Sequence, residues 1–148
     1  EKNNFKNIQI MSYTAKYSSS LYAPFRSALG SSSSLGKKDK STYQMDFSNS
    51  NEAIQEAKLD IAEGADMLMV KPGLPYLDII QKLKMNFNIP IFAYQVSGEY
   101  SMLMNAINNN YLDEKIILEF LTSFKRAGCN GMLTYFAPLA AKLIQEQN

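Results

Sequence analysis

Two lysines stand at positions where a charged side chain is unexpected. Lys71 follows the apolar run 67–70 and precedes a Pro-Gly pair, so it is the last residue of a predicted buried strand. Lys16 ends a second strand-like run, residues 8–15. Burial lowers the pKa of a lysine because the ammonium loses its hydration, and a second ammonium nearby lowers it further. Since a neutral amine can attack a ketone, the pair predicts Schiff-base chemistry if both lysines face one mouth.

Solvation is the competing interpretation of each lysine. A strand-end lysine can reach water along its aliphatic stem, and for one lysine alone we favour that interpretation. Two lysines on the same rim make the two interpretations equally good. The next two predicted strands end at Ser97 and Tyr135, so two hydroxyl groups would join the lysines at that rim.

The chain repeats one pattern four times: a short strand-like run, a loop and a stretch with helical periodicity. The strand-like runs are residues 8–15, 67–70, 89–96 and 131–136. The main helical stretches are residues 49–64, 75–87, 113–128 and 137–147. Asn49 or Ser50 is expected to cap the first of these helices, and Gly64 and Gly128 are expected to end two of them. Alternating strands and helices predict a parallel sheet with helical crossovers.

Two α/β architectures fit such a sheet: an open doubly wound sheet and a (β/α)8 TIM barrel. No glycine-rich phosphate fingerprint follows any predicted strand, which disfavours the nucleotide-binding version of the first. Four β/α units make half a barrel, and a whole barrel usually needs roughly 250 residues. The chain has 148 residues and does not begin with Met. We therefore expect one partial domain, residues 1–148, that forms the C-terminal half of a TIM barrel.

Residues 30–41 break the repeated pattern. Serine and glycine make this segment flexible, and three lysines make it cationic. A solvated loop is the simpler interpretation. Its place after a strand end also fits a sharper interpretation, an active-site lid that meets an anionic substrate.

The composition argues against several classes of partner and site. Apolar residues make up 46% and charged residues 20% of the chain, as in soluble globular proteins. The formal net charge of +1 gives no reason to expect nucleic acid or a membrane surface as partner. Cys129 is the one cysteine and histidine is absent, so the chain has neither an intrachain disulfide nor a Cys/His metal cluster.

Five longer motifs carry a family resemblance. In chain order they read MSYTAKYSSSLYAPFR, TYQMDFSNSNEA, EGADMLMVKPGLPYLDII, YQVSGEY and FKRAGCNGMLTYF. Together, and in this order, they closely resemble the porphobilinogen synthase family, also called 5-aminolevulinate dehydratase. The resemblance implies a (β/α)8 barrel and a hydro-lyase that condenses two molecules of 5-aminolevulinate, with loss of two waters, to porphobilinogen for haem and other tetrapyrroles.

The resemblance also implies roles for single residues at a first substrate position, the P-site. Lys71 resembles the lysine that forms a Schiff base with the P-site substrate, which becomes the propionate-bearing side of the product. Ser97 and Tyr135 resemble the pair that hydrogen-bonds the carboxylate of that substrate.

A second set of residues resembles the A-site of the family. Lys16 resembles the second Schiff-base lysine. Arg26 and Lys40 resemble the cations that take the A-site carboxylate, with Gln44 beside them. Some family members have arginine at the position of Lys40; lysine keeps the charge but loses the bidentate fork.

The metal content stays partly open in this resemblance. Zinc-dependent members use a cysteine cluster in the first half of the barrel, which this chain does not contain, so the sequence neither requires nor excludes catalytic zinc. Glu56 matches the position where magnesium-stimulated members bind an allosteric Mg²⁺ through water; a solvated helix carboxylate is an equally good interpretation. The motifs TYQMD and YQVSGEY resemble the magnesium-type branch. Family members form homo-octamers, and we expect a location in the cytosol or a plastid.

Two other functions stay open. A different class I Schiff-base aldolase or lyase, acting on a small keto acid, would share the lysine of the VKP motif but would not need the second lysine or the carboxylate-binding set. An inactive, truncated half barrel is the other alternative, although the two intact lysines argue against degeneration. Because half a barrel leaves two exposed parallel edges, we expect this chain by itself to turn over poorly.

Overall fold

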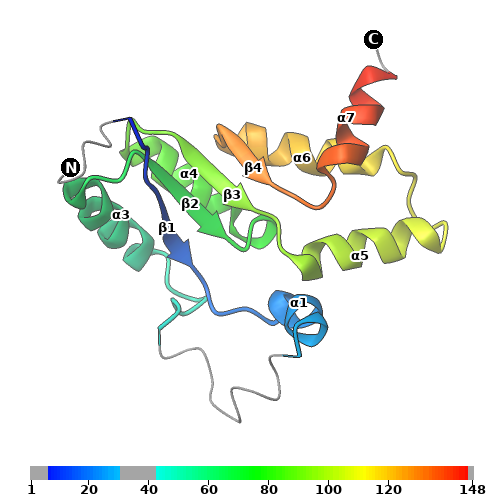
Figure 1. The fold of residues 1–148 in the computed structure, drawn as a ribbon, viewed down its shortest axis with the longest axis horizontal. Coiled ribbons are helices and arrows are strands. Elements are labelled where there is room, and N and C mark those ends of the chain that lie inside the picture. Colours follow the sequence, from blue (N-terminus) through cyan, green and yellow to red (C-terminus); the bar gives the residue numbers. More distant parts are fainter. Residues whose placement is uncertain (1–6, 31–42, 147–148) are drawn as a thin grey trace.

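The structure contains one four-stranded parallel sheet. The computed structural model describes residues 7–30 and 43–146 (Figure 1). The strands lie side by side in chain order, and every neighbouring pair is parallel. Their bounds are β1 Met11–Lys16, β2 Met67–Lys71, β3 Ile91–Tyr94 and β4 Gly131–Leu133. The four predicted strands are confirmed, and their sequential order is that of barrel units, because a doubly wound sheet reverses its strand order.

Three helices cover one face of this sheet. Helices α3, α4 and α6 lie side by side, with α3 against β1 and α4 against β3 (Figure 1). Helix α1 packs on α5, and α7 packs on α6. Among the described residues no helix has both the length and the apolarity needed to cross a membrane. The bounds are α1 Ala23–Ala28, α3 Asn51–Glu63, α4 Leu77–Asn86, α5 Ser97–Asn108, α6 Ile116–Ala127 and α7 Ala137–Gln145, with 3-10 turns η1 Ser20–Tyr22 and η3 Leu74–Tyr76.

The two faces of the sheet carry different side chains. Leu68 and Val70 of β2 are fully buried in the main hydrophobic core, together with residues of α3, α4 and α6. Successive residues of a strand point to opposite faces, so Met69 and Lys71 project away from these helices. The face opposite the helices therefore carries the strand-end lysine of β2.

The helix boundaries follow from local signals in the sequence. Asn49 Oδ1 accepts hydrogen bonds from the backbone N–H groups of Asn51 (3.0 Å) and Glu52 (3.3 Å) at the start of α3. Gly64 and Gly128 end α3 and α6 with φ angles of 105° and 108°, in the left-handed region that favours glycine. The predicted cap and both predicted stops are confirmed.

Several elements are shorter than predicted, among them β3, which spans residues 91–94 of the predicted 89–96, β4 and α6. The strand expected over residues 131–136 ends at Leu133, because Thr134 begins a turn in which its Oγ1 accepts the backbone N–H of Phe136 at 3.0 Å. The helix expected from Asp113 begins three residues later, and the Asp113 carboxylate accepts the backbone N–H of Lys115 instead. Of the predicted lid, residues 31–41 lie outside the described residues, so the lid stays a prediction.

Candidate active site

The two strand-end lysines are direct neighbours across the sheet. Lys16 and Lys71 are register partners at the ends of parallel strands β1 and β2. Partners in parallel strands project from the same face, with backbones about 4.8 Å apart. The pairing depends on a β-bulge: between Ser12 and Ala15 the register shifts by one residue, so three steps along β1 match two along β2. The structure thus brings together the two lysines that the sequence places at strand ends.

A first cavity, of about 120 Å³, lies at the end of β2. Lys71, Ser97 and Tyr135, the three residues predicted for the P-site, all line it. The rest of its wall is mostly aromatic and consists of Tyr13, Tyr22, Phe25, Tyr94 and Val96. Among these lining residues only the lysine can carry a formal charge at neutral pH, so the cavity suits a small molecule with a carboxylate and a reactive carbonyl.

A second cavity, of about 200 Å³, adjoins the first, and Lys71 lies in the wall of both. Lys16, Arg26 and Gln44, three of the residues predicted for the A-site, line this second cavity. Lys40, the fourth, lies outside the described residues. The predicted P-site and A-site residues that the structure describes therefore fall into two separate but adjoining cavities.

The surroundings of Lys71 favour the neutral amine. Burial lowers its pKa, and the positive charge of Lys16 lowers it further. Lys71 Nζ lies 3.7 Å from the centroid of the Tyr94 ring, and 5.4 and 5.9 Å from those of Tyr13 and Tyr22. Aromatic faces attract an ammonium, but rings packed around the nitrogen also replace its water. The lowered pKa gives this lysine a larger neutral fraction than an exposed lysine has, as attack on a ketone requires.

Two of the hydroxyl groups that line the first cavity, those of Ser97 and Tyr135, are the hydrogen-bond donors predicted for the P-site. Ser97 Oγ accepts the backbone N–H of Phe25 at 3.1 Å, and among the described residues its own hydrogen can be donated to a partner in the cavity. Burial, and then the neighbouring Tyr94, raises the pKa of Tyr135, so its phenol stays protonated. Two neutral donors near an amine suit the recognition of a carboxylate.

Tyr22 ties the ends of β1 and β2 together. Its hydroxyl donates to the carbonyl oxygens of Tyr17 (3.0 Å) and Lys71 (3.3 Å). Burial raises the pKa of this phenol, so it remains a donor throughout the physiological pH range. The guanidinium of Arg26 lies over the same ring, 5.4 Å from its centroid. One side chain thus braces both strand ends and supports the cation of the second cavity.

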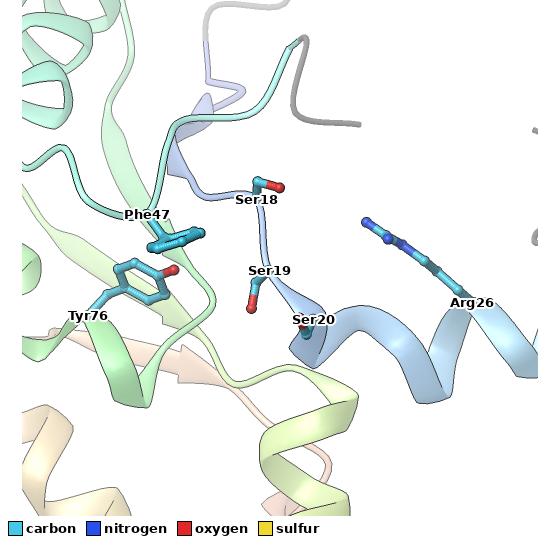
Figure 2. Close-up of a pocket in the computed structure, with 6 residues that line it drawn as sticks. All are labelled: Ser18, Ser19, Ser20, Arg26, Phe47 and Tyr76. Carbon is cyan, nitrogen blue, oxygen red and sulfur yellow. The ribbon is translucent and has the colours of Figure 1, made fainter. Parts of the chain in front are cut away.

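Arg26 also borders a polar hollow of about 390 Å³ outside the two lysine cavities. Figure 2 shows Arg26 extending from α1 on one side, the rings of Phe47 and Tyr76 on the other, and the serines at 18–20 between them. The serine hydroxyls and the guanidinium make this hollow a polar approach to the second cavity.

Glu56 lies in a different hollow, of about 430 Å³, which Glu52 also lines. Lys16 and Gln44 border the same hollow, so it adjoins the second cavity. Gln44 Oε1 is buried without a hydrogen-bond partner among the described residues. Within residues 7–30 and 43–146, no three His, Cys, Asp or Glu side chains are grouped to hold a metal directly.

Sequence reasoning missed the aromatic wall of the first cavity. Strict alternation from Ile91 places Tyr94 opposite the buried side of β3, so the sequence does contain a signal for this ring. Tyr13 has no such signal, because it stands an odd number of residues before Lys16 and alternation assigns the two to opposite faces. The bulge in β1 brings Tyr13 and Lys16 to the same hollow, and the sequence does not reveal it.

The sequence matches known proteins of one family. The family model described as Delta-aminolevulinic acid dehydratase matches residues 1–143. Over 140 residues the chain is 61% identical to the Delta-aminolevulinic acid dehydratase of Rhodobacter capsulatus. The matched stretch covers 94% of this chain and 42% of that protein. Over 147 residues the chain is 52% identical to the Delta-aminolevulinic acid dehydratase of Bacillus subtilis (strain 168). This match covers 99% of this chain and 45% of that protein.

A solved structure shows the same likeness. The chain superposes with a TM-score of 0.88 and 54% identity on delta-aminolevulinic acid dehydratase (porphobilinogen synthase) from Toxoplasma gondii ME49 in complex with the reaction product porphobilinogen. The match covers 91% of this chain and 38% of that one, so the chain spans less than half the length of these relatives. The likeness confirms the resemblance seen in the motifs and the predicted fold class, four β/α units of a barrel.

Proposed function

The chain belongs to the delta-aminolevulinic acid dehydratase family, and from this premise we propose that it carries the Schiff-base site of a porphobilinogen synthase. The whole protein would be a lyase, more narrowly a hydro-lyase, that joins two molecules of 5-aminolevulinate with loss of two waters. The observation that carries the proposal is the pair of adjoining cavities, each with its own amine, with Lys71 in the wall of both.

In the first cavity Lys71 is the nucleophile. Its neutral amine attacks the ketone carbon of one 5-aminolevulinate, and loss of water leaves an iminium. Ser97 and Tyr135 donate hydrogen bonds to the substrate carboxylate, which holds the ketone against the amine. Tyr94, whose ring centroid lies 3.7 Å from Lys71 Nζ, presents its electron-rich face to the positive iminium.

In the second cavity Lys16 forms the corresponding iminium with the other substrate molecule. Arg26 supplies the charge that holds this substrate's carboxylate, with Lys40 as a second cation and Gln44 as a hydrogen-bonding neighbour. Each iminium is an electron sink, which permits C–C and C–N bonds to form beside it. Because Lys16 and Lys71 are register partners, the two bound molecules meet at high effective concentration.

The cationic segment 30–41 is the proposed lid over these cavities. Leu29 and Gln44, which stand on either side of it in the chain, both line the second cavity. A lid that closes from this side would compensate the A-site carboxylate and exclude water while the iminium forms.

We also propose a regulatory Mg²⁺ at Glu56, held through water. The hollow offers the oxygen ligands that Mg²⁺ prefers: the carboxylates of Glu52 and Glu56, and Gln44 Oε1, which has no hydrogen-bond partner among the described residues. Catalytic zinc would need ligands from outside this chain, because Cys129 is its one cysteine and burial raises the pKa of that thiol to about 12. Loss of Mg²⁺ stimulation in Glu56→Gln, with basal turnover retained, would support the site; unchanged stimulation would oppose it.

For the whole protein we propose a homo-octamer in the cytosol or a plastid, on the family resemblance alone. Light scattering of the natural protein, purified from its source, tests the first part. Organelle fractionation tests the second.

Borohydride trapping followed by peptide mass spectrometry tests the proposed chemistry. We expect 5-aminolevulinate to leave a reduced adduct on Lys71 and a weaker one on Lys16 of the complete natural protein. No adduct on the folded protein would contradict the Schiff-base site. Adducts with pyruvate but not with 5-aminolevulinate would favour an aldolase that acts on a small keto acid.

A further inference from the structure

Glu99 is a buried carboxylate that lines neither lysine cavity. Its exposed fraction is 3%, and it is the third residue of α5. Its oxygens accept three backbone hydrogen bonds, from the N–H groups of Val96 (2.7 Å), Gly73 (3.1 Å) and Leu74 (2.5 Å). Burial raises the pKa of this carboxyl, and the three bonds oppose that shift by favouring the charged form.

Only one of these bonds serves the helix to which Glu99 belongs. A glutamate at the third helical position that accepts the N–H of the N-cap residue, here Val96, forms half of a capping box. Gly73 and Leu74 lie 26 and 25 residues earlier in the chain. Their two bonds join the turn after β2 to the first turn of α5, and helix capping does not need them.

This connection lies between two residues of the first cavity. Lys71 stands two residues before Gly73, and Ser97 stands two residues before Glu99, so each end of the connection begins at a predicted substrate-binding group. The surrounding backbone is closely packed as well, because a side chain at Gly98 would collide with the backbone of Leu21. Glu99 therefore joins the backbone segment that follows Lys71 to the one that begins at Ser97.

We propose that Glu99 is a positioning residue that sets the distance between the Lys71 amine and the Ser97 hydroxyl. This distance lets one 5-aminolevulinate reach the Lys71 amine with its ketone and the Ser97 hydroxyl with its carboxylate. The inference rests on the proposed function of the site. It differs from a helix cap, which would involve the Val96 bond alone.

Two variants separate the positioning role from the capping role. Glu99→Asp is one methylene shorter: aspartate near a helix N-terminus can still accept the Val96 N–H, but it cannot also span to the turn after β2. Glu99→Gln keeps the length of the side chain but replaces one acceptor oxygen with an NH₂ group. This group cannot accept a hydrogen bond from the backbone N–H groups that it faces. Glu119→Asp, on the exposed side of the first turn of α6, is the matched control.

The experiment traps the complete natural protein with 5-aminolevulinate and borohydride and measures the ratio of Lys71 adduct to Lys16 adduct. Lys16 serves as an internal reference. We expect both Glu99 variants to lower this ratio by about tenfold or more, because Glu99→Asp loses the bonds to Gly73 and Leu74, and Glu99→Gln loses the charge and one acceptor oxygen. Hydrogen exchange at the amides of Gly73 and Leu74 should accelerate, while the amides of α5 in Glu99→Asp stay protected. Glu119→Asp should change neither quantity.

An unchanged adduct ratio in folded Glu99→Asp and Glu99→Gln would overturn this inference and leave the proposed function intact. Loss of α5 protection, or of the whole fold, in both variants would make Glu99 a structural cap and would overturn it too. If the wild-type protein formed no adduct on either lysine, the proposed function would fail and the inference would fail with it.

Discussion

The two lysine cavities differ in how the fold builds them, although their lysines are register partners. The first cavity is lined by Lys71 of β2 and Tyr94 of β3, the two inner strands of the described sheet, as well as by Tyr13 of β1, and Glu99 joins the loops beside it. The second lies at β1, an outer strand of that sheet. There a single parallel bridge, Tyr17 to Met45, brings in the segment that carries Gln44.

Their polar groups differ in the same way. Ser97 in the first cavity already accepts a backbone hydrogen bond that orients its hydroxyl. In the second, Gln44 Oε1 is buried without a partner in the part of the chain that the structure describes. A group that is oriented before substrate arrives loses less entropy on binding than one that must still find its partners. The Ser97 hydroxyl of the first cavity is therefore preorganised, whereas Gln44 Oε1 of the second has no such bond among the described residues.

Removal of the Lys71 amine from the first cavity should have the largest effect on turnover. Lys71→Met should lower turnover by at least about 10³-fold, because loss of the nucleophile in other covalent enzymes costs up to about 10⁶-fold. Steady-state formation of porphobilinogen by the complete protein measures the effect. Lys125→Met, at the exposed end of α6, is the control. Turnover within tenfold of wild type would remove Lys71 from the mechanism.

Lys16→Met tests whether the cavities communicate electrostatically. The Lys71 pKa lies below its ordinary value of 10.5, first through burial and second through Lys16. Loss of Lys16 removes the second cause, so the pKa of Lys71 should rise while burial still holds it below that value. The pH at which Lys71 is half-maximally trapped should therefore move upward. The absence of a shift would show that the two ammonium groups do not interact.

Variants of the carboxylate-binding residues should have intermediate effects on KM, larger in the first cavity than in the second. Ser97→Ala removes an oriented donor to a charged substrate, which should raise KM about tenfold. Gln44→Ala removes an uncharged group whose Oε1 has no hydrogen-bond partner among the described residues, so the KM of this variant should rise only about threefold, in the range of a neutral hydrogen bond. Substrate titrations of the two variants measure the difference. A larger effect at Gln44 would reverse the comparison.

The aromatic wall should give the smallest effect. Tyr94→Leu removes the ring whose centroid lies 3.7 Å from Lys71 Nζ, and exposed cation–π contacts correspond to about two- to fivefold in rate. Tyr13→Leu, with its centroid at 5.4 Å, is the matched variant and should change turnover less. Single-turnover trapping of Lys71 measures both rates. Equal effects would show that the rings only fill space.

Sequence reasoning identified the parts of the molecule that depend on local signals. Asn49, Gly64 and Gly128 mark helix ends through bonds and backbone angles made within a few residues, so their positions could be predicted. Lys16 and Lys71 stand out because a strand end after an apolar run is also a local pattern. The motifs added the grouping of the carboxylate-binding residues, which no local pattern contains.

Contacts between distant segments escaped that reasoning. Glu99 looks like an ordinary residue of a helix start, and its bonds to Gly73 and Leu74 depend on the packing of two loops. Thr134 shortens β4 through a side-chain bond that competes with the strand ladder. Tyr13 joins the cavity only because β1 contains an extra residue.

That extra residue makes β1 two half-strands that are out of phase. The first half is anchored at its start, where Asp66 accepts the N–H of Ile10 at 2.7 Å and Asp60 accepts the Ser12 hydroxyl at 2.8 Å. The second half presents Lys16 to the site. Deletion of one residue between these halves would shift one of them in register. Either the hydrogen bonds of Ile10 and Ser12 or the pairing of Lys16 with Lys71 would then be lost, whereas a substitution leaves both in register. The number of residues in β1 is therefore constrained more tightly than their identity. A scan of single deletions would detect this requirement for length, and a scan of substitutions would not.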